Sequence, residues 1–478
     1  ANATDATKRT YFSTYRTDAS IDLLAVGGDV RLANAATIAA NFGLGDVGDS
    51  AATLTLYPGT LRAATLVGDV RTDGRFSMVP AARGQLELLA ADSVRVGNRI
   101  VMSALPESAV PSAAMPDADY TSHLKAITSA DYFSRTAYGP TLLHAGDPEP
   151  VRIVAQTGDI AGPDTEIFLQ LPKRFVMRAG GNLTGGWIGA QNLAADEWSA
   201  ITTGGDIRYD VTATGTRIGS SNARLEMGGP GRLFVIAGGT VDLGPSGGIV
   251  SRGNFNNAAL PEDGADVVVM AGASKIAYEN LLFKYTDPGL LRMPASGGAV
   301  VGPDDDPSQV ARLPTAVVDA WNAALLQSAR AESGDPALTL AQARAIRAAQ
   351  LVDGASFVNF MTSGDAPLEP LLRDAFFADV LRFGGMLATE KLPRPYEFVD
   401  QAIAALFPAA PTDAAAAARA RSNLSLFLSQ IRSEQGGAID ILVPDGFVSV
   451  GVTEQVTARP ASELGIITTR GGSIRSIV

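Results

Sequence analysis

The stretch ITTGGDIRYD, residues 201–210, decides how the rest of this chain is interpreted. Two glycines, Asp206 and an apolar residue form a tight turn between two short strands, which in isolation indicates a hairpin. Close copies of this pattern occur as IDLLAVGGDVRL from Ile21, VRIVAQTGDIAG from Val151 and RLFVIAGGTVDLG from Arg232. The turn is therefore one instance of a rule that recurs along the chain.

The apolar residues that follow these turns recur at a nearly constant interval. The interval is 24 residues from Val70 to Val94, 23 from Ile160 to Leu183 and 24 from Leu183 to Ile207. This period is too short for a βαβ unit, but it suits one coil of a parallel β-helix with three short strands. Longer intervals then indicate coils that carry an insertion.

The sequence predicts a mainly β fold: a right-handed parallel β-helix, or solenoid, with an inserted α-helical module. Leu183 and Val241 should lie on either side of Ile207 in neighbouring coils. An alternative is a sandwich of antiparallel hairpins, where turns recur about every 8 to 12 residues without a longer period. The predicted structural corner positions are Gly28, Asp29, Gly68, Asp69, Gly158, Asp159, Gly181, Asn182, Gly205, Asp206, Gly239, Gly446 and Gly472.

Glycine allows the same tight corner to be stacked repeatedly, and the small polar residue after it can satisfy backbone donors there. We place β-helix coils in residues 1–303, with loop excursions at about 98–150, 252–264 and 279–307. The helical module occupies 304–421, and the coils resume over 422–478 and are expected to continue further.

The helical module is predicted from a change in apolar spacing. Val310, Leu313, Val317, Trp321 and Leu325 are three or four residues apart, as on one face of an amphipathic helix. Further helical segments are expected at about 339–352, 367–388, 396–407 and 412–421.

Composition excludes several classes of function. The chain has 478 residues and a formal net charge of −12, which disfavours nucleic-acid binding. Cysteine is absent and there are only two histidines, so a thiolate metal site is excluded and nucleophilic catalysis has few residues to use. No apolar run reaches the roughly 18 residues that a transmembrane helix needs.

The sequence becomes recognisable near its carboxyl end. SNLSLFLSQIRSEQGGAIDILVPDGFVSVG (422–451), followed by LGIITTRGGSIRSIV (464–478), resembles the carboxy-terminal region of filamentous haemagglutinin family exoproteins. These are the secreted partners of bacterial two-partner secretion systems. In that family an SQI-(K/R)-(T/S)-EQGG stretch is typically followed by coils with Gly-Asp corners, where this chain has Ser422-Asn423 and Gly446-Phe447 instead.

The resemblance implies a secreted protein associated with the bacterial outer membrane and cell surface. It implies export through an outer-membrane transporter partner and a structural role in adhesion to a surface glycan or protein of a host or bacterium. It supplies no catalytic residues, so we expect no enzymatic activity and no cofactor. One alternative is a carbohydrate-active β-helix enzyme, a polysaccharide lyase or glycosidase, with carboxylates and basic groups on adjacent coils. Another is the shaft of a contact-dependent toxin delivery protein.

Two further groups of residues are candidate sites. Asp304, Asp305 and Asp306 could hold calcium, but their spacing matches no EF-hand loop, and an acidic turn before a helix explains them better. We therefore expect no metal site. His123 and His144 are expected to be surface or loop-packing residues.

The final residues of the chain suggest a pairing edge. The sequence stops one strand into a new coil, without a polar cap. An uncovered coil can pair with another strand, so we expect another coil or another molecule to cover residues 474–478 by self-association or continuation.

Overall fold

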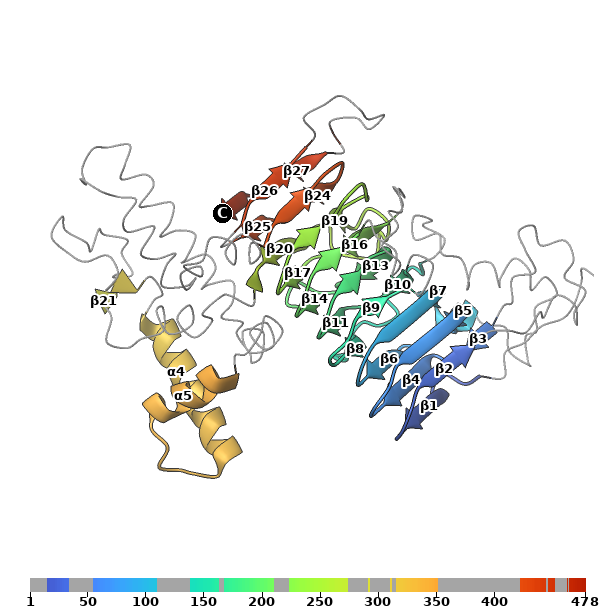
Figure 1. The fold of residues 1–478 in the computed structure, drawn as a ribbon, viewed down its shortest axis with the longest axis horizontal. Helices are drawn as coiled ribbons and strands as arrows, with labels where there is room; N and C mark the ends of the chain where they lie inside the picture. The colour runs from blue at the N-terminus through green and yellow to red at the C-terminus, as the bar shows by residue number, and fades with distance from the viewer. Residues whose placement is uncertain are drawn as a thin grey trace, which may run out of the picture. The chain divides into compact units, whose positions relative to one another are not determined.

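The computed structural model describes residues 15–33, 55–109, 138–162, 167–209, 223–273, 291–292, 310–311, 315–350, 422–443, 446–451, 462 and 464–478. Its strands stack into a parallel β-helix (Figure 1). The mainly β solenoid predicted from the sequence is confirmed.

The first face of the β-helix is a sheet of ten strands, one from each coil. All neighbouring strands in it are parallel. We number the coils 1 to 10 by these strands. In order they are β1 (Ser20–Ala25), β4 (Thr60–Thr65), β6 (Gln85–Ala90), β8 (Val151–Ala155), β11 (Phe175–Ala179), β14 (Trp198–Thr203), β17 (Arg232–Ala237), β20 (Asp266–Ala271), β25 (Ile439–Leu442) and β28 (Ile474–Ile477).

The second face follows the first after a sharp bend, which we call the first corner. Its strands are short because each crosses a narrow side of the coil. They are β2 (Val30–Ala33), β9 (Ile160–Ala161), β12 (Leu183–Thr184), β15 (Ile207–Arg208), β18 (Val241–Asp242), β23 (Leu424–Leu426) and β26 (Val448–Val450).

The third face returns the chain to the next coil. Its strands are β3 (Thr55–Tyr57), β10 (Phe168–Leu171), β13 (Trp187–Gln191), β16 (Arg224–Gly228), β19 (Ile249–Gly253), β24 (Gln430–Ser433) and β27 (Gly465–Thr468). In coils 2 and 3 the long strands β5 (Val70–Met78) and β7 (Val94–Met102) span both the second and third faces, and their pairing joins these two faces into one continuous sheet. The excursion expected from residue 98 therefore begins only after Met102, near the short 3-10 helix η1 (Glu107–Ala109).

The predicted stack at the corner is confirmed. Leu183 of β12 pairs with Ile207 of β15, and Ile207 pairs in turn with Val241 of β18, all in parallel register. These three side chains are fully buried. The alternative of antiparallel hairpins is wrong for this part of the chain.

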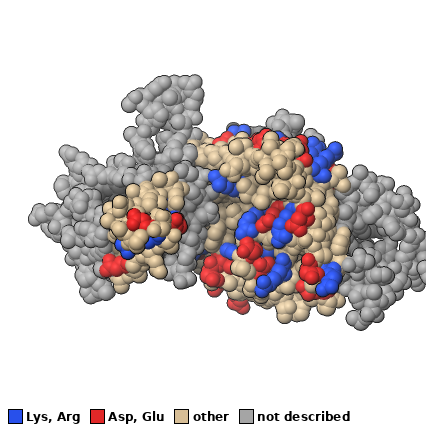
Figure 2. All heavy atoms as spheres, turned by 90° about the horizontal axis from the view of Figure 1, so that it is seen from below, with Lys and Arg blue, Asp and Glu red and all other residues tan. Residues whose placement is uncertain are grey.

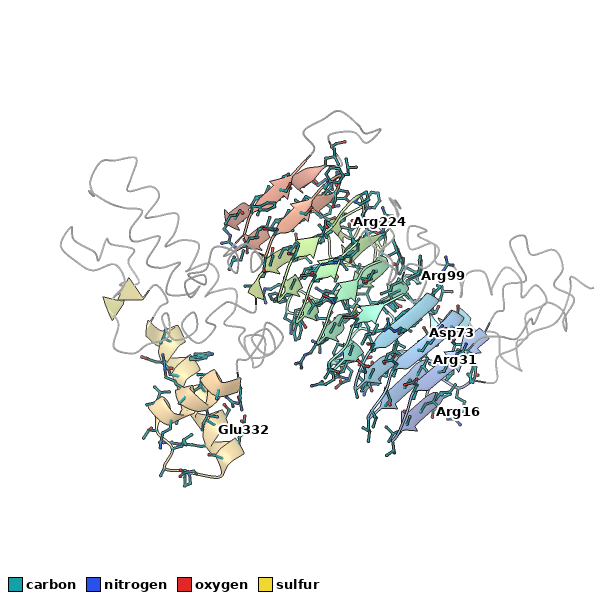
Figure 3. All side chains as sticks on the ribbon, in the orientation of Figure 1. Arg16, Arg31, Asp73, Arg99, Arg224 and Glu332 are labelled. Atoms are coloured by element: carbon teal, nitrogen blue, oxygen red, sulfur yellow. The ribbon has the colours of Figure 1, made fainter. Side chains whose placement is uncertain are left out.

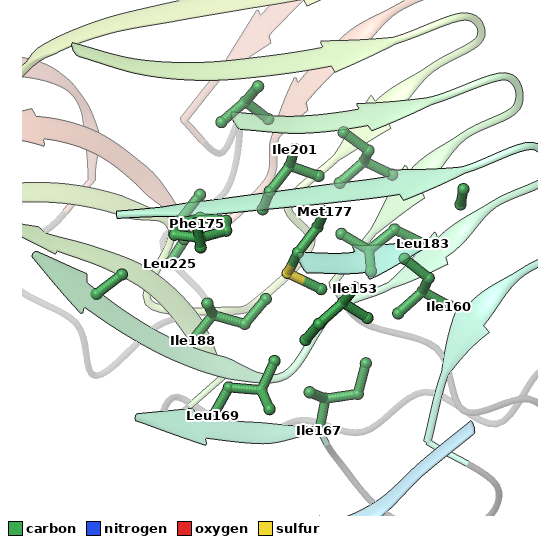
Figure 4. Packing of buried hydrophobic residues seen from close by; sticks show 14 of the residues in the cluster. Ile153, Ile160, Ile167, Leu169, Phe175, Met177, Leu183, Ile188, Ile201 and Leu225 are labelled. Atoms are coloured by element: carbon green, nitrogen blue, oxygen red, sulfur yellow. The ribbon is translucent and has the colours of Figure 1, made fainter. Parts of the chain in front are cut away.

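Side-chain alternation fills the interior. In β11, Phe175, Met177 and Ala179 are buried in the core, while the residues between them are half-buried on the outer side. Ile153, Met177 and Ile201 occupy the same register position in three successive coils (Figure 4). Each fully buried aliphatic side chain contributes about 1.5 to 3 kcal/mol, so the narrow core stabilises every coil through its neighbours.

The chain divides into two compact units, residues 1–271 with 422–478 and residues 272–421. The first is the β-helix. Within its described residues, the second contains a strand pair, β21 (Leu291–Arg292) with β22 (Val310–Ala311), and two helices, α4 (Thr315–Ser333) and α5 (Leu340–Gln350).

Helix α4 differs from its predicted start. Val310 lies in β22 and the helix begins at Thr315, so Val310 is not on its apolar face. Val318, Leu325 and Ala329 are buried along α4, and Leu325 and Ala329 pack with Ala343 of α5. Helix α5 matches the segment predicted at 339–352. The segments predicted at 367–388, 396–407 and 412–421 lie outside the described residues.

One assignment at the carboxyl end is corrected. The sequence pattern groups Ile474 with the apolar residues that start the second face, but it pairs with Ile439 on the first face. Gly472 therefore lies at the bend between the third and first faces, and not at the first corner. Strand β28 is an edge strand of the first face, and Ile474 is 46% exposed in the single chain. Its covering by another coil or molecule stays a prediction.

Candidate functional site

The recurring first corner is a ladder of hydrogen bonds between coils. The Oδ1 atom of Asn182 accepts a hydrogen bond from the backbone N of Asp206 at 2.8 Å, and Asp206 Oδ1 accepts one from Thr240 N at 2.7 Å. The same bond joins every pair of neighbouring coils from 1 to 9. The remaining pairs are Asp29 with Asp69 (2.9 Å), Asp69 with Ser93 (2.9 Å), Ser93 with Asp159 (3.2 Å), Asp159 with Asn182 (2.6 Å), Thr240 with Asn423 (3.2 Å) and Asn423 with Phe447 (3.1 Å).

The carbonyl groups at this corner are also held by the neighbouring coil. Leu183 N donates to Asp206 O at 2.9 Å, and Ile207 N donates to Thr240 O at 2.9 Å. Both backbone polar groups of the corner residue in one coil are thus bound by the coil before it. This satisfies groups that would otherwise be costly to bury.

The ladder explains why glycine precedes the polar residue. A Cβ atom on Gly205 would lie within 3.0 Å of Asn182 Oδ1, and one on Gly239 within 3.0 Å of Asp206 Oδ1. Neither glycine has a positive φ. The requirement is therefore the close approach of the accepting side chain from the previous coil, and not a left-handed backbone.

Sequence reasoning named most of these residues but not all of their partners. Ser93 and Asn423 accept hydrogen bonds in the ladder although neither follows a glycine, and neither is among the predicted corner positions. Their signal was the register of the apolar residue that follows each of them. The aspartates are engaged in the stack, so their recurrence has a structural cause.

Charged residues form a second ladder on the outer side of the first face. Asp22, Arg62, Glu87 and Arg152 follow one another in register on coils 1 to 4. The pairs measure 2.9 Å for Arg62 Nη1 to Asp22 Oδ1 and 2.8 Å for Arg152 Nη1 to Glu87 Oε1. Acidic and basic side chains alternate over one side of the molecule (Figure 2). Exposed pairs of this kind contribute little stability, about 0 to 1 kcal/mol each.

The same column becomes apolar in the middle coils. Val176, Ala200, Phe234 and Val268 continue it on coils 5 to 8, and the charged pair Asp440 and Arg475 ends it. This column of the first face thus has charged ends and an apolar centre.

The outer side of the third face carries a buried ionic cluster. Arg252 of β19 is hydrogen-bonded through Nε to Glu226 of β16, and its Nη1 lies 2.9 Å from both carboxylate oxygens of Glu434, next to β24. Arg224 and Arg432 flank it, each 3.4 Å from a glutamate. The side chain of Glu226 is 0% exposed, and burial raises its pKa against the opposing effect of Arg252 and Arg224.

This cluster links coils 6, 7 and 8, and an aromatic stack lies on the same face. The rings of Phe168 and Trp187 are stacked with centroids 4.3 Å apart, and the Arg99 guanidinium lies 4.4 Å from the Phe168 centroid. Arg99 and Arg224 extend from this side of the third face in Figure 3. Arg252 binds both Glu226 and Glu434, and Glu226 has no exposed surface, so these ion pairs hold the three coils together. We call Glu226, Arg252 and Glu434 the ionic lock.

Buried polar side chains also hold the excursion that ends at Pro150 against the β-helix. Lys173 is 2% exposed, and its Nζ donates to Asp147 Oδ2 and Gln85 Oε1, each at 2.7 Å. His144 is also buried, with Nδ1 3.2 Å from the carbonyl oxygen of Ala82. Burial, with the nearby Lys173 cation, lowers the pKa of His144 to about 4. His144 is therefore a neutral loop-packing residue in the folded chain.

The other candidates are not in the part of the chain that the structure describes. His123 and Asp304, Asp305 and Asp306 all lie outside it. Within the described residues, no three acidic or histidine side chains are grouped so that they could bind a metal ion. Neither described helix is long and apolar enough to cross a membrane.

In the described residues, the polar groups thus mainly bind neighbouring coils of the solenoid to each other, and its outer faces form the surface. Comparison with known proteins found no matching family model, no matching curated protein and no matching solved structure.

Proposed function

We propose that this chain is a structural and adhesive segment of a secreted or cell-surface bacterial exoprotein of the filamentous haemagglutinin kind. The observation that carries the proposal is the first-corner ladder, which runs without a break through coils 1 to 9. It accounts for the recurring Gly-Asp pairs as a way of stacking many similar coils. A long stack of coils offers extended outer faces to a partner.

The carboxy-terminal motif at 422–451 and 464–478 supports the same proposal, because it carries the resemblance to these exoproteins. The partners we propose are an outer-membrane transporter during secretion and a surface glycan or protein at the cell contacted. Attachment would use the outer faces and the excursions that rise from them.

The experiment must distinguish the adhesive segment from the alternative, a carbohydrate-active enzyme. Such an enzyme needs two carboxylates, or a carboxylate and an arginine, that reach a sugar. Two groups of described residues place carboxylates and arginines on adjacent coils: Asp22, Arg62, Glu87 and Arg152 on the first face, and Glu226 and Glu434, bridged by Arg252, on the third. Glu226 is fully buried, which supports a locking role.

The test uses the purified chain on a panel of immobilised bacterial and host polysaccharides and surface glycoproteins. Binding is measured by surface plasmon resonance, and turnover by new reducing ends and by ultraviolet absorbance of unsaturated products. We expect saturable binding without turnover, retained in Glu434→Gln and in the exposed-pair variant Arg62→Gln. Turnover that is lost in Glu434→Gln would establish the enzyme instead, and absence of binding across the panel would contradict adhesion.

A further inference from the structure

A small cavity lies where two excursions meet the β-helix. It is lined by Tyr138, Leu142 and His144 from the excursion before β8, by Gln191 at the end of β13 and Leu193 after it, and by Asn257 from the loop after β19. The space open to the centre of a water molecule is about 10 Å³. This is close to the minimum that holds one water molecule.

The hydrogen bond of His144 fixes its tautomer. Its Nδ1 lies 3.2 Å from the carbonyl oxygen of Ala82, which can only accept, so Nδ1 carries the proton. The ring is neutral because burial lowers its pKa to about 4. Its Nε2 is therefore a buried acceptor, and it has no hydrogen-bond partner among the described residues.

The orientation of Gln191 is fixed in the same way. Its Oε1 accepts a hydrogen bond from Asn257 Nδ2 at 3.1 Å, which leaves Nε2 as the donor end of the amide. Gln191 is 1% exposed, and its Nε2 has no acceptor among the described residues. A buried polar group without a partner costs about 1 to 3 kcal/mol, so two in one cavity call for a ligand.

We propose that this cavity binds a single water molecule that donates to His144 Nε2 and accepts from Gln191 Nε2. The chemistry selects water over an ion. The lining residues include no Asp, Glu, Lys or Arg, an anion would face the lone pair of His144, and a cation would face the amide hydrogens of Gln191. The space excludes larger neutral molecules.

The bound water has a structural consequence that does not depend on the proposed function. It joins the excursion that contains His144 to the end of β13, where Gln191 already binds Asn257 of the second excursion. The two excursions are thereby fastened to each other and to coil 5.

Crystal structures of the full chain and of two variants test the proposal. In the wild type we expect one water peak within about 3.2 Å of both His144 Nε2 and Gln191 Nε2. Gln191→Met keeps the size of the side chain but removes the amide, and should lose the peak. Gln170→Met, the same change at a buried glutamine outside the cavity lining, should keep it.

Nitrogen-15 spectra of the histidine rings test the tautomer in solution. We expect His144 to be protonated at Nδ1 with a hydrogen-bonded Nε2, and Gln191→Met to shift the Nε2 resonance without changing the tautomer. A dry cavity in the wild type, a direct bond between the two side chains, or a proton on Nε2 would overturn the proposal. These wild-type readings decide the matter even if Gln191→Met fails to fold.

Discussion

Gly204 packs directly on the backbone of Gly180, its counterpart in the preceding coil. A Cβ atom on Gly204 would lie within 3.0 Å of the Gly180 carbonyl oxygen, and no flexible side chain is available there to move aside. We therefore expect Gly204→Ala to reduce the free energy of unfolding by about 1 to 3 kcal/mol, as overpacking does in other cores. Urea denaturation followed by circular dichroism measures this.

The matched control is Gly27→Ala, at the same corner position in coil 1. No atom lies within 4 Å of a Cβ there, and its φ is not positive. It should change stability by no more than about 0.5 kcal/mol. Equal effects of the two substitutions would show that the preceding coil does not impose the glycine.

The acceptor role of Asp206 predicts a difference between two substitutions. Asp206→Ala removes the acceptor for Thr240 N and should destabilise the corner by about 1 kcal/mol, with faster hydrogen exchange at the Thr240 amide. Asp206→Asn should retain most of the protection, because Asn182 performs the same role one coil earlier. Equal exchange in both variants would count against the ladder.

The buried histidine predicts an acid-sensitive excursion. The folded-state pKa of His144, about 4, is below the ordinary value of 6.5, so the unfolded chain takes up a proton first as pH falls. The stability linked to this group is present above about pH 6.5 and is lost as pH falls towards 4, amounting to about 3 kcal/mol. Hydrogen exchange of residues 138–150 between pH 7 and 4.5 measures the loss.

His144→Asn supplies the control for that experiment. The Asn amide can still donate to Ala82 O but does not titrate, so the acid-induced increase in exchange should shrink at residues 138–150. His123→Asn removes the other histidine and serves as the matched comparison. If hydrogen exchange in His144→Asn keeps its full pH dependence, then buried carboxylates, and not His144, make the excursion sensitive to acid.

The ionic lock on the third face predicts non-additive mutations. Arg252→Met leaves Glu226 buried without its closest partner and should cost about 3 to 5 kcal/mol. The double variant Glu226→Met with Arg252→Met should be more stable than Arg252→Met alone. For comparison, Arg62→Met in the exposed charge ladder should cost about 0 to 1 kcal/mol. Additive losses in the double variant would refute the lock.

The position of the insertion predicts that it can be removed. The corner of coil 7 spans residues 237–241, and joining residue 272 to residue 422 gives a corner of the same length, from 271 to 424. Because Val241 already pairs with Leu424 and Thr240 binds Asn423, deletion of 273–421 should leave a folded β-helix. We expect the hydrogen-exchange protection of the Leu424 amide to be unchanged in the deletion variant. An unfolded or aggregated product would contradict the prediction.

The stacking of coils could be predicted from the sequence because the pattern that indicates it is short and occurs many times. Gly205, Asp206 and Ile207 stand together in one short stretch, and copies of that stretch give both the corner and the period. Ser93 and Asn423 were missed as partners because the ladder needs only a short side chain with an acceptor oxygen, which no single residue type marks.

The ionic lock could not be predicted, because its members come from distant parts of the chain. Arg252 and Glu434 are 182 residues apart, with the insertion between them, and only the register of β19 on β24 brings them together. The start of α4 was also misplaced, since Val310 continues the three-to-four spacing by chance while its backbone pairs with β21. Apolar spacing alone does not separate a residue of a short strand from the first turn of a helix that follows it.

The first-corner ladder has a polarity that sets an order of assembly. The amide of Asp206 is bound by Asn182 and its carbonyl by Leu183, so both bonds come from the coil nearer the amino terminus. The same is true of Thr240, which is bound by Asp206 and Ile207. Each finished coil is therefore the template on which the corner of the next is closed. A chain that emerges amino terminus first can therefore close the corner of each coil on the coil before it.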